Sequence, residues 1–372
     1  MNILILNWRD VHHPKFGGAE IVTMEHAKGW VVAGHKVTWL TAGYSGAKKH
    51  STVEGVQFVR RAGSFTVYLY ASFYVLINAR TFDVIVDEVH GFPFFSRLFT
   101  RKPVVIFIHE IAGEIWDYMF SFPKSAIGKL LERWYFQLYK HCLFWTDAPS
   151  TVNELVAQGI PRRQCVAIPC PIPPGYQQYT TTVIQKEHHP TYLFVSRVVR
   201  MKGIEEVIKA FSFIAREQQS AVLWIVGGGE LHYIQELTRM AEEYGVRNRV
   251  TFFGNLSEKE KYDRMGRAHL LLHASVKEGW GLVVLEAAVS GTPAIVYNVP
   301  GLRDVVQNNK TGVVIANNSP SDMAREAVNL QGNPVRYREL QKNAKQRAMS
   351  LHWSDVCKQS ERVLKQAYEN MG

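Results

Sequence analysis

Two glutamates, Glu278 and Glu286, flank a glycine-containing turn. The turn follows an apolar run, residues 269–274, that we expect to be a buried strand, and it leads into a predicted helix over 282–290. At 3.6 residues per turn, Glu286 lies on roughly the same side of that helix as the turn. A helix start favours an anion such as a phosphate, and the carboxylates can bind hydroxyl groups beside it. The alternative is a pair of solvated surface glutamates, because this spacing also occurs by chance.

Basic residues stand at a second predicted junction between a strand and a helix. Arg197 and Lys202 lie between a strand over 192–196 and a helix over 204–217. Fixed cations beside a helix start can hold a diphosphate and neutralise the charge that grows as it leaves. Three glycines, 227–229, close the next strand and allow the backbone to approach a ligand. Solvated basic residues and ordinary turn chemistry are the alternatives for these two features.

Short apolar segments alternate with helical segments along the chain. Strands that are apolar nearly throughout and separated by helices predict parallel sheets with both faces covered. The proline-rich segment 169–175 interrupts the alternation, so we expect an α/β protein of two doubly wound, Rossmann-like domains facing a cleft. The predicted strands are 2–7, 35–41, 56–60, 83–89, 103–109, 143–146, 192–196, 221–226, 250–253, 269–274, 293–297 and 312–315. The predicted helices are 18–33, 204–217, 231–244, 258–267, 282–290, 334–350 and 354–370.

Composition narrows the class of protein. The chain has 372 residues, 47% of them hydrophobic and 20% charged, which predicts a soluble protein of two domains. Its first residues are expected to form a strand and not a signal peptide. The four cysteines show no metal-ligand spacing and fit free thiols in a reducing cytoplasm. The net charge of +10 suits an anionic partner such as a nucleotide or a membrane surface, but no nucleic-acid-binding module is recognisable.

These motifs together resemble a known family. In order and spacing they are similar to the nucleotide-sugar domain of retaining glycosyltransferases of family 4, which have the two-Rossmann GT-B architecture. The residues that carry this resemblance are Arg197, Lys202, Gly203, Gly227, Gly228, Gly229, Phe253, Gly254, Glu278, Gly279, Trp280, Gly281 and Glu286. In the first half, residues 17–20 resemble the family's Gly-Gly loop, and His109 lies where a histidine commonly follows a core strand.

The resemblance implies a division of the chain. Residues 1–172 would form the N-terminal, acceptor-binding domain, and residues 173–190 an interdomain linker. Residues 191–350 would form the domain that binds the nucleotide-sugar donor. Residues 351–372, with Trp353 and the last helix, would cross back and pack on the N-terminal domain.

The resemblance also implies roles for single residues. Arg197 and Lys202 would bind the donor diphosphate, Glu278 would approach the donor sugar, and His109 would contact that sugar near the reacting carbon. These four are the expected catalytic residues. The expected donor-binding residues are Gly17, Gly18, Arg197, Lys202, Gly227, Gly279, Trp280, Gly281, Leu282 and Glu286, of which Glu286 would bind the ribose and Gly17 and Gly18 would border the diphosphate and the acceptor.

No metal and no cofactor is expected beyond the nucleotide-diphosphate sugar, which is a co-substrate. The acidic residues Asp83, Asp87 and Glu88 lie near a strand end but form no Asp-x-Asp motif.

A basic and aromatic segment, residues 122–145, could lie on an anionic membrane surface, and the aromatic stretch 67–77 could add to it. The alternative is a core helix with solvated lysines. An enzyme with a lipid-linked acceptor would then be cytoplasmic and peripheral on the inner face of the membrane.

The sequence therefore predicts a metal-independent, retaining glycosyltransferase, expected to transfer a hexose. It would move the sugar from its nucleotide to a hydroxyl of a glycan or lipid-linked acceptor, in the assembly of cell-surface polysaccharide or glycolipid. A nucleotide-sugar epimerase of the same architecture and a non-catalytic nucleotide-sugar-binding partner at a membrane are the alternatives. A dinucleotide dehydrogenase is disfavoured, because no Gly-x-Gly-x-x-Gly follows the first strand.

Overall fold

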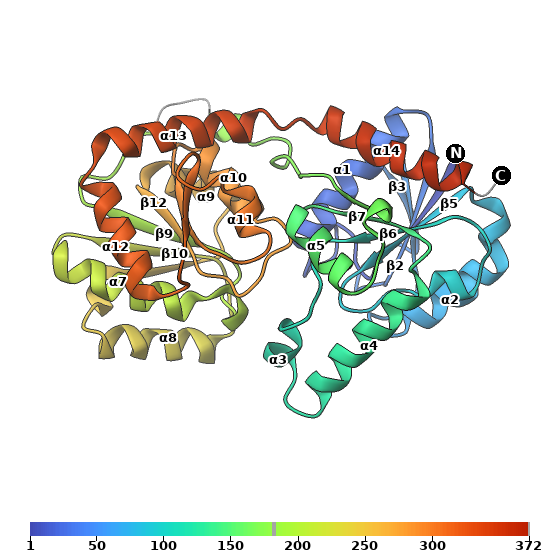
Figure 1. The fold of residues 1–372 in the computed structure, drawn as a ribbon, viewed down its shortest axis with the longest axis horizontal. Coiled ribbons are helices and arrows are strands. Elements are labelled where there is room, and N and C mark those ends of the chain that lie inside the picture. Colours follow the sequence, from blue (N-terminus) through green and yellow to red (C-terminus); the bar gives the residue numbers. More distant parts are fainter. Residues whose placement is uncertain (181–183, 371–372) are drawn as a thin grey trace. The chain divides into compact units, whose positions relative to one another are not determined.

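A computed structural model describes residues 1–180 and 184–370 (Figure 1). The chain divides into two compact units. Unit 1 contains residues 1–173 together with 352–372, and unit 2 contains residues 174–351. Residues 181–183 of the expected linker and residues 371–372 of the expected C-terminal segment lie outside the described part.

Unit 1 is built on an eight-stranded sheet in the order β3-β4-β2-β1-β5-β6-β7-β8. Neighbouring strands are parallel except for the antiparallel pair β3 and β4, and four of the strands (β1, β5, β6 and β7) run side by side in that order. The strands are β1 (Asn2–Leu6), β2 (Lys36–Thr41), β3 (His50–Val53), β4 (Val56–Arg60), β5 (Val84–Val89), β6 (Val104–Ile108), β7 (Leu143–Thr146) and β8 (Cys165–Ala167). Strands β5 and β6 are buried along their whole length, as expected for a sheet covered on both faces.

The helices of unit 1 are α1 (Gly18–Val32), α2 (Val67–Asn78), α3 (Ile115–Met119), α4 (Lys124–Leu138), α5 (Pro149–Ala157) and α14 (Trp353–Glu369). The last helix, α14, packs on α1 although the whole of unit 2 separates them in sequence. Buried Ser360 fixes this contact, because its hydroxyl lies 2.9 Å from Nδ1 of His26 and 3.0 Å from Nε1 of Trp30. Trp353 donates a hydrogen bond from Nε1 to the carbonyl oxygen of Ile172, at 2.8 Å.

Unit 2 contains a six-stranded parallel sheet in the order β11-β10-β9-β12-β13-β14. The strands are β9 (Thr191–Val195), β10 (Val222–Val226), β11 (Val250–Gly254), β12 (Leu270–His273), β13 (Ala294–Tyr297) and β14 (Gly312–Ile315). The helices are α6 (Gln177–Thr180), α7 (Ile204–Glu217), α8 (Leu231–Glu243), α9 (Glu258–Arg267), α10 (Leu282–Val289), α11 (Leu302–Val305), α12 (Pro320–Gln331) and α13 (Pro334–Met349).

Apart from residue 173, the described part of the expected linker belongs to unit 2. Tyr179 of α6 stacks on Tyr262 of α9, with ring centroids 5.4 Å apart. Lys186 donates from Nζ to the carbonyl oxygen of Ala268 at 2.6 Å and to Oγ1 of Thr292 at 2.7 Å. The described residues that follow the boundary at residue 173 are therefore fixed to unit 2 within a few residues of it, and the expected linker over 173–190 stays a prediction.

Both sheets change winding direction once. In unit 1 the change falls between β1 and β5, and in unit 2 it falls between β9 and β12. Ligands of doubly wound proteins bind beyond the carboxyl ends of the strands at this switch point. Among the described helices, none is both long enough and apolar enough to cross a membrane. No disulfide bond joins the cysteines of the described part of the chain.

Candidate active site

The switch point of unit 2 brings Lys202 and Glu278 together. Lys202 ends a short 3₁₀ turn after β9, and Glu278 lies in the loop after β12. Nζ of Lys202 is 2.6 Å from Oε1 of Glu278, and the two side chains are only 12% and 14% exposed. His273, the buried last residue of β12, places Nε2 at 3.2 Å from the same oxygen. Two expected site residues thus form one ion pair, which a third group supports.

The charge of Glu278 is fixed by its neighbours. Burial alone would raise the pKa of this carboxyl group, but Lys202 and His273 outweigh it and hold the pKa well below its usual range. Glu278 is therefore a carboxylate at neutral pH. Arg197 lies nearby in sequence and is exposed, and within the described ranges it forms no ion pair. It is a cation available to an anionic ligand.

Two glycines allow the loops at this edge to approach one another. Gly203 has φ +69°, and a Cβ atom there would lie 1.9 Å from the backbone oxygen of Ala274. Gly227 has φ +132°, and a Cβ atom there would lie 1.8 Å from the backbone oxygen of Ser196. A residue with a side chain would push these loops apart. The glycines thus hold the loops after β9, β10 and β12 close to the switch point.

The turn that contains Gly279 leads into α10, as the sequence predicts. Trp280 is buried, Gly281 is the N-cap, and Leu282 is the first helical residue. Glu286 follows one turn later and pairs with Lys261 of α9, with Nζ 3.2 Å from Oε1. Burial raises the pKa of Glu286, although Lys261 opposes this effect.

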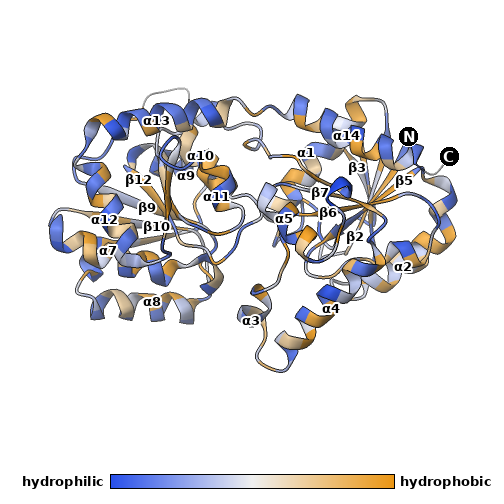
Figure 2. Ribbon diagram, viewed as in Figure 1, coloured by the Kyte–Doolittle hydropathy of each residue, from blue (hydrophilic) through white to orange (hydrophobic). Residues whose placement is uncertain are grey.

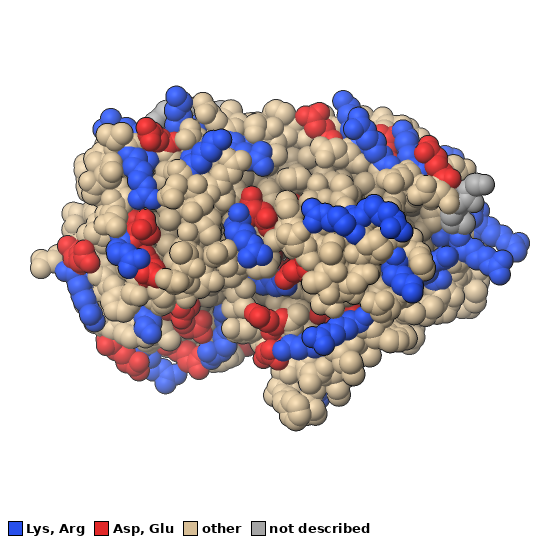
Figure 3. All heavy atoms as spheres, viewed as in Figure 1, with Lys and Arg blue, Asp and Glu red and all other residues tan. Residues whose placement is uncertain are grey.

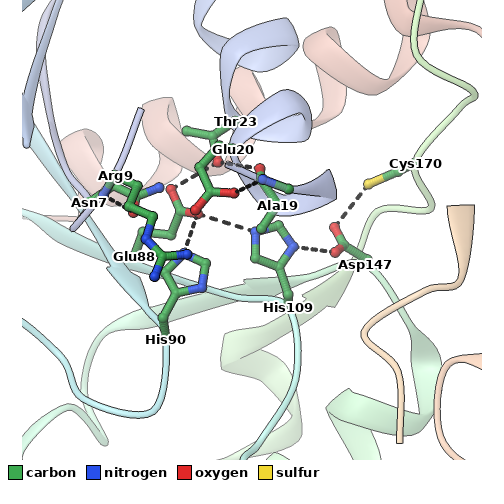
Figure 4. A network of polar contacts seen from close by, with 11 residues as sticks. Asn7, Arg9, Ala19, Glu20, Thr23, Glu88, His90, His109, Asp147 and Cys170 are labelled. Carbon is green, nitrogen blue, oxygen red and sulfur yellow. Dashed lines mark hydrogen bonds and ion pairs between the residues drawn. The ribbon is translucent and has the colours of Figure 1, made fainter. Parts of the chain in front are cut away.

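In unit 1, His109 lies at the centre of a buried polar network (Figure 4). It follows β6 and contacts a carboxylate on each side, from β5 and from the loop after β7. Its Nδ1 is 2.5 Å from Oδ2 of Asp147, and its Nε2 is 3.2 Å from Oε1 of Glu88. The same Glu88 oxygen is 2.8 Å from Nε2 of His90, and the other one accepts a hydrogen bond from Oγ1 of Thr23 on α1, at 2.8 Å.

The network favours a protonated His109. Burial alone would lower the pKa of its imidazole, but Asp147 and Glu88 outweigh burial and raise it to about 10. In return, His109 and His90 overcome the effect of burial on Glu88 and lower the pKa of this carboxyl group to about 2. His109 is therefore an imidazolium whose two N–H groups face carboxylates. In this state it cannot accept a proton, so it cannot serve as a general base at neutral pH.

A cysteine continues the network. Sγ of Cys170 donates to Oδ1 of Asp147 at 3.0 Å, and burial raises the pKa of this thiol well above its usual value. Cys170 lies three residues before the boundary between the units. The chain of contacts therefore runs from His109 to the segment where unit 1 ends.

Gly17 and Gly18 mark the start of α1. Gly17 is the N-cap, and its N–H donates to Oε2 of Glu20 at 2.7 Å, while Gly18 is the first helical residue. Glu20 points toward the network in Figure 4. The Gly-Gly loop thus lies on the same helix as Thr23, which contacts Glu88.

Three of these side chains could also hold a metal ion. Ligand atoms of Glu88, His90 and His109 all lie within 4.8 Å of one another. Their direct contacts of 2.8 and 3.2 Å satisfy them as hydrogen-bonded groups. The expected absence of a metal stays a prediction. Asp87 does not belong to this group, since its carboxylate accepts hydrogen bonds from the backbone of Phe94 and from the hydroxyl of Tyr139.

The sequence predicts some residues of the Lys202–Glu278 site and of the network around His109, but not all of them. It named Lys202, Glu278, Glu286 and His109 as site residues, and the structure places each beside a charged partner. It did not name the partners as site residues, namely His90, Asp147, Cys170, Lys261 and His273. One signal was present: Asp147 directly follows β7 as His109 directly follows β6, and the carboxyl ends of neighbouring parallel strands meet at one edge.

Two doubly wound α/β units with charged side chains gathered at their switch points match the architecture of GT-B proteins. Residues 16–176 match the family model Glycosyltransferase Family 4, and residues 182–347 match Glycosyl transferases group 1. The chain is therefore a glycosyltransferase of the family 4 type with the GT-B fold.

Three of the proteins that are similar to this chain illustrate the relationship. An uncharacterized glycosyltransferase of Methanocaldococcus jannaschii is 26% identical to this chain, and the match covers 100% of both chains. A GDP-mannose-dependent alpha-(1-6)-phosphatidylinositol monomannoside mannosyltransferase of Mycobacterium tuberculosis is 34% identical, but the match spans only 36% of each chain. The crystal structure of Anabaena HepE in complex with UDP and glucose aligns with a TM-score of 0.73 and 17% identity, covering 98% of this chain and 100% of that one.

Proposed function

We propose that this glycosyltransferase moves a hexose from a nucleoside-diphosphate sugar to a hydroxyl of a glycan or lipid-linked acceptor, with retention of anomeric configuration and without a metal ion. The observation that carries the proposal is the ion pair of Lys202 and Glu278 at the switch point of unit 2. A cation and a carboxylate there supply the two kinds of group that a sugar diphosphate needs. The cation binds phosphate oxygens and the carboxylate binds sugar hydroxyls.

The donor would occupy the edge of unit 2 where β9, β10 and β12 end. Lys202 and exposed Arg197 would contact the diphosphate, together with the free N–H groups at the start of α10. Glu286, on the same helix, would accept hydrogen bonds from the ribose hydroxyls. HepE binds UDP and glucose, and the mycobacterial relative uses GDP-mannose, which supports a nucleoside-diphosphate donor of this type.

In the reaction, the bond between C1 of the sugar and the diphosphate oxygen breaks, and the diphosphate leaves with the electron pair. The acceptor oxygen forms its bond to C1 on the same face, and its proton passes to an oxygen of the leaving phosphate. Fixed cations that contact the diphosphate stabilise the charge that develops on it. No strong protein base is needed, which agrees with the protonated state of His109.

A donor panel tests this proposal. The purified protein is incubated with UDP-glucose, UDP-galactose, UDP-N-acetylglucosamine or GDP-mannose, with and without candidate acceptors, and nucleoside diphosphate release is measured. We expect release with one or two donors, at a rate that rises when the right acceptor is added. Conversion of the donor to an epimer without an acceptor would establish the epimerase alternative. Binding without turnover, under any acceptor, would establish a non-catalytic partner.

Two further measurements address the finer parts of the proposal. Proton NMR of the fresh product should show the anomeric configuration of the donor, and the opposite configuration would refute retention. Turnover should be unchanged after dialysis against EDTA. A loss of turnover that added metal restores would refute metal independence and point to Glu88, His90 and His109.

We also propose that unit 1 contacts an anionic membrane surface. In helix α4, Ile127, Leu130, Leu131 and Trp134 recur at helical spacing and are 52%, 68%, 39% and 54% exposed. An apolar stripe at this spacing normally faces a protein core, whereas this one faces solvent. Helix α2 has a second exposed stripe, formed by Leu69, Phe73, Leu76 and Ile77. Figure 2 shows apolar residues on both helices.

Lysine and arginine side chains accompany the stripe on α4. Lys124, Arg133 and Lys140 are exposed on or just after this helix. Exposed apolar residues flanked by cations match the requirements of the interface of an anionic bilayer. The alternative of a core helix accounts only for the opposite face, which includes the buried residues Tyr135 and Phe136.

Vesicle sedimentation tests the membrane proposal. The protein should pellet with vesicles that contain phosphatidylglycerol at low salt, and the double variant Leu130→Ser/Trp134→Ser should stay in the supernatant. A matched control replaces the exposed apolar residues Leu231 and Val335 of unit 2 with serine and should pellet like the wild type. Equal pelleting of both variants would refute the assignment of this surface.

A further inference from the structure

A hollow of about 380 Å³ opens at the amino-terminal edge of the sheet of unit 1. It is lined by residues from separate parts of the chain: Arg97 from a 3₁₀ turn, Lys102 before β6, His141 before β7, Arg163 before β8, and residues at the end of α14. An adjoining hollow of about 240 Å³ shares Arg163 and Gln164 with it and adds Arg362. Side chains brought together from distant segments form a concave surface of the size that small ligands occupy.

The charge of this concavity has one sign. Among the described residues that line either hollow, none is an aspartate or a glutamate. Within the same described part of the chain, Arg97, Lys102, Arg163 and Arg362 form no ion pair with a carboxylate. Figure 3 shows lysine and arginine side chains gathered on the edge of unit 1 near the end of the chain. Like charges that converge without counter-charges attract an anion.

A neutral group adds to the cations. Oε1 of Gln164 is buried and has no hydrogen-bond partner among the described residues. A side-chain amide can donate to a phosphate oxygen and can also accept a hydrogen bond from a hydroxyl group. The lining therefore fits a ligand that carries both a phosphate and hydroxyl groups.

This concavity is separate from the candidate active site. Lys102 lies just before the first residue of β6, and His109 lies just after its last residue. At about 3.3 Å per residue along an extended strand, the two positions are roughly 20 Å apart, on opposite edges of the sheet. A ligand in this hollow would not be the donor sugar at the switch point.

We propose that the hollow lined by Arg97, Lys102, His141, Arg163 and Gln164 is a second binding site, specific for a phosphate ester of a polyol. The same chemistry occurs in a free sugar or glycerol phosphate and in the headgroup of an anionic phospholipid. The proposal is independent of the donor site, because it uses none of the residues at either switch point.

Hydrogen exchange followed by mass spectrometry tests this proposal and locates the ligand. Glycerol 3-phosphate is the free probe, and vesicles of phosphatidylcholine with phosphatidylglycerol are the lipid probe. We expect one of the two to slow exchange in peptides that cover residues 97–104, 141–143 and 163–166. Vesicles of phosphatidylcholine alone should not do so.

A charge-matched pair of variants decides the outcome. Lys102→Glu/Arg163→Glu should raise the half-saturating probe concentration by about tenfold or more, because two charged contacts are lost. Arg239→Glu/Lys345→Glu, with the same charge change on exposed helices of unit 2, should behave like the wild type. Arg163→Gln is a milder variant that keeps the test valid if the double variant does not fold.

Each result is decisive. Protection by glycerol 3-phosphate that the first variant weakens supports a soluble ligand. Protection by phosphatidylglycerol vesicles alone, weakened in the same way, supports a lipid headgroup. No protection by either probe, or equal protection in both double variants, overturns the proposal.

Discussion

Replacing Asp147 with asparagine removes one of the two carboxylates that hold the His109 imidazolium. The substitution keeps the size of the side chain and an oxygen that can accept the hydrogen bond from Nδ1. Asp147 is the nearer carboxylate, at 2.5 Å against 3.2 Å for Glu88. We therefore expect Asp147→Asn to lower the pKa of His109 by about 2, to roughly 8, a change typical of the loss of one adjacent opposite charge.

The magnitude follows from the pKa of His109, which is about 10 in place of the usual 6.5. A raised pKa means that the contribution of the imidazolium to stability is fully present below pH 6.5 and is lost as pH rises through 10. The loss is about 1.4 kcal/mol per pH unit, so the wild type should lose roughly 3 kcal/mol of this contribution between pH 6.5 and 9. With a pKa near 8, Asp147→Asn should lose only about 1.5 kcal/mol over the same range.

Two assays check this prediction. NMR titration of the histidine side chains gives the pKa of His109 directly, with the signal assigned by its absence in His109→Gln. Urea unfolding at pH 6.5 and pH 9 gives the difference in the free energy of unfolding. Asp83→Asn, at the opposite end of β5, is the control and should follow the wild type. A His109 pKa that stays near 10 in Asp147→Asn would refute the reasoning.

Three further substitutions follow from the geometry. Glu286→Gln should raise the KM for the donor by about tenfold and change kcat little, because the substitution removes the charge of the side chain and keeps its size. Initial rates measure both constants. An unchanged KM would contradict the role of Glu286 in binding ribose. Gly203→Ala would place a Cβ atom 1.9 Å from a backbone oxygen. It should lower the free energy of unfolding by about 1–3 kcal/mol more than Gly245→Ala, because Gly245 has a similar φ of +71° but open space around it. Equal losses of this free energy on urea unfolding would argue against a close approach. Gly29→Ala would place a Cβ atom 2.3 Å from Sγ and 2.5 Å from Cβ of Cys357 and should loosen α14, exposing it to limited proteolysis. Adding Cys357→Gly, which removes both atoms, should restore resistance, and no rescue would contradict this packing.

Most of the regular structure could be predicted from the sequence because its signals are local. Helices α7 (Ile204–Glu217) and α9 (Glu258–Arg267) and strands β4, β7 and β14 begin and end at the predicted residues. These segments combine a clear hydrophobic pattern with turn or capping residues, such as Ser257, which caps α9.

The elements that the sequence analysis missed depend on tertiary contacts. Strands β3 and β8 lie at the two edges of the sheet of unit 1, and none of their residues is fully buried. Both are short, and β3 has only one apolar residue. Helix α12 (Pro320–Gln331) was also missed, although Ser319 and Pro320 give an ordinary start signal.

The site could be predicted only in part, for a related reason. The donor motifs are short and continuous in the sequence, and they led to Lys202 and Glu278. The carboxylate partners of His109 come from β5 and from the loop after β7, and pairing them requires the strand order β5-β6-β7. Glu88 was assigned only to a strand end, because its burial and its contact with His109 are properties of the folded sheet.

The most direct test of the donor site measures the binding of UDP and GDP to the wild type and to Lys202→Ala by isothermal titration calorimetry. Lys345→Ala, an exposed lysine of α13, is the matched control. If Lys202 holds the diphosphate, one of the nucleotides should bind to the wild type and the control with the same dissociation constant. Lys202→Ala should raise this constant by roughly tenfold or more and reduce sugar transfer with it. Equal binding and equal transfer by all three proteins would contradict the account.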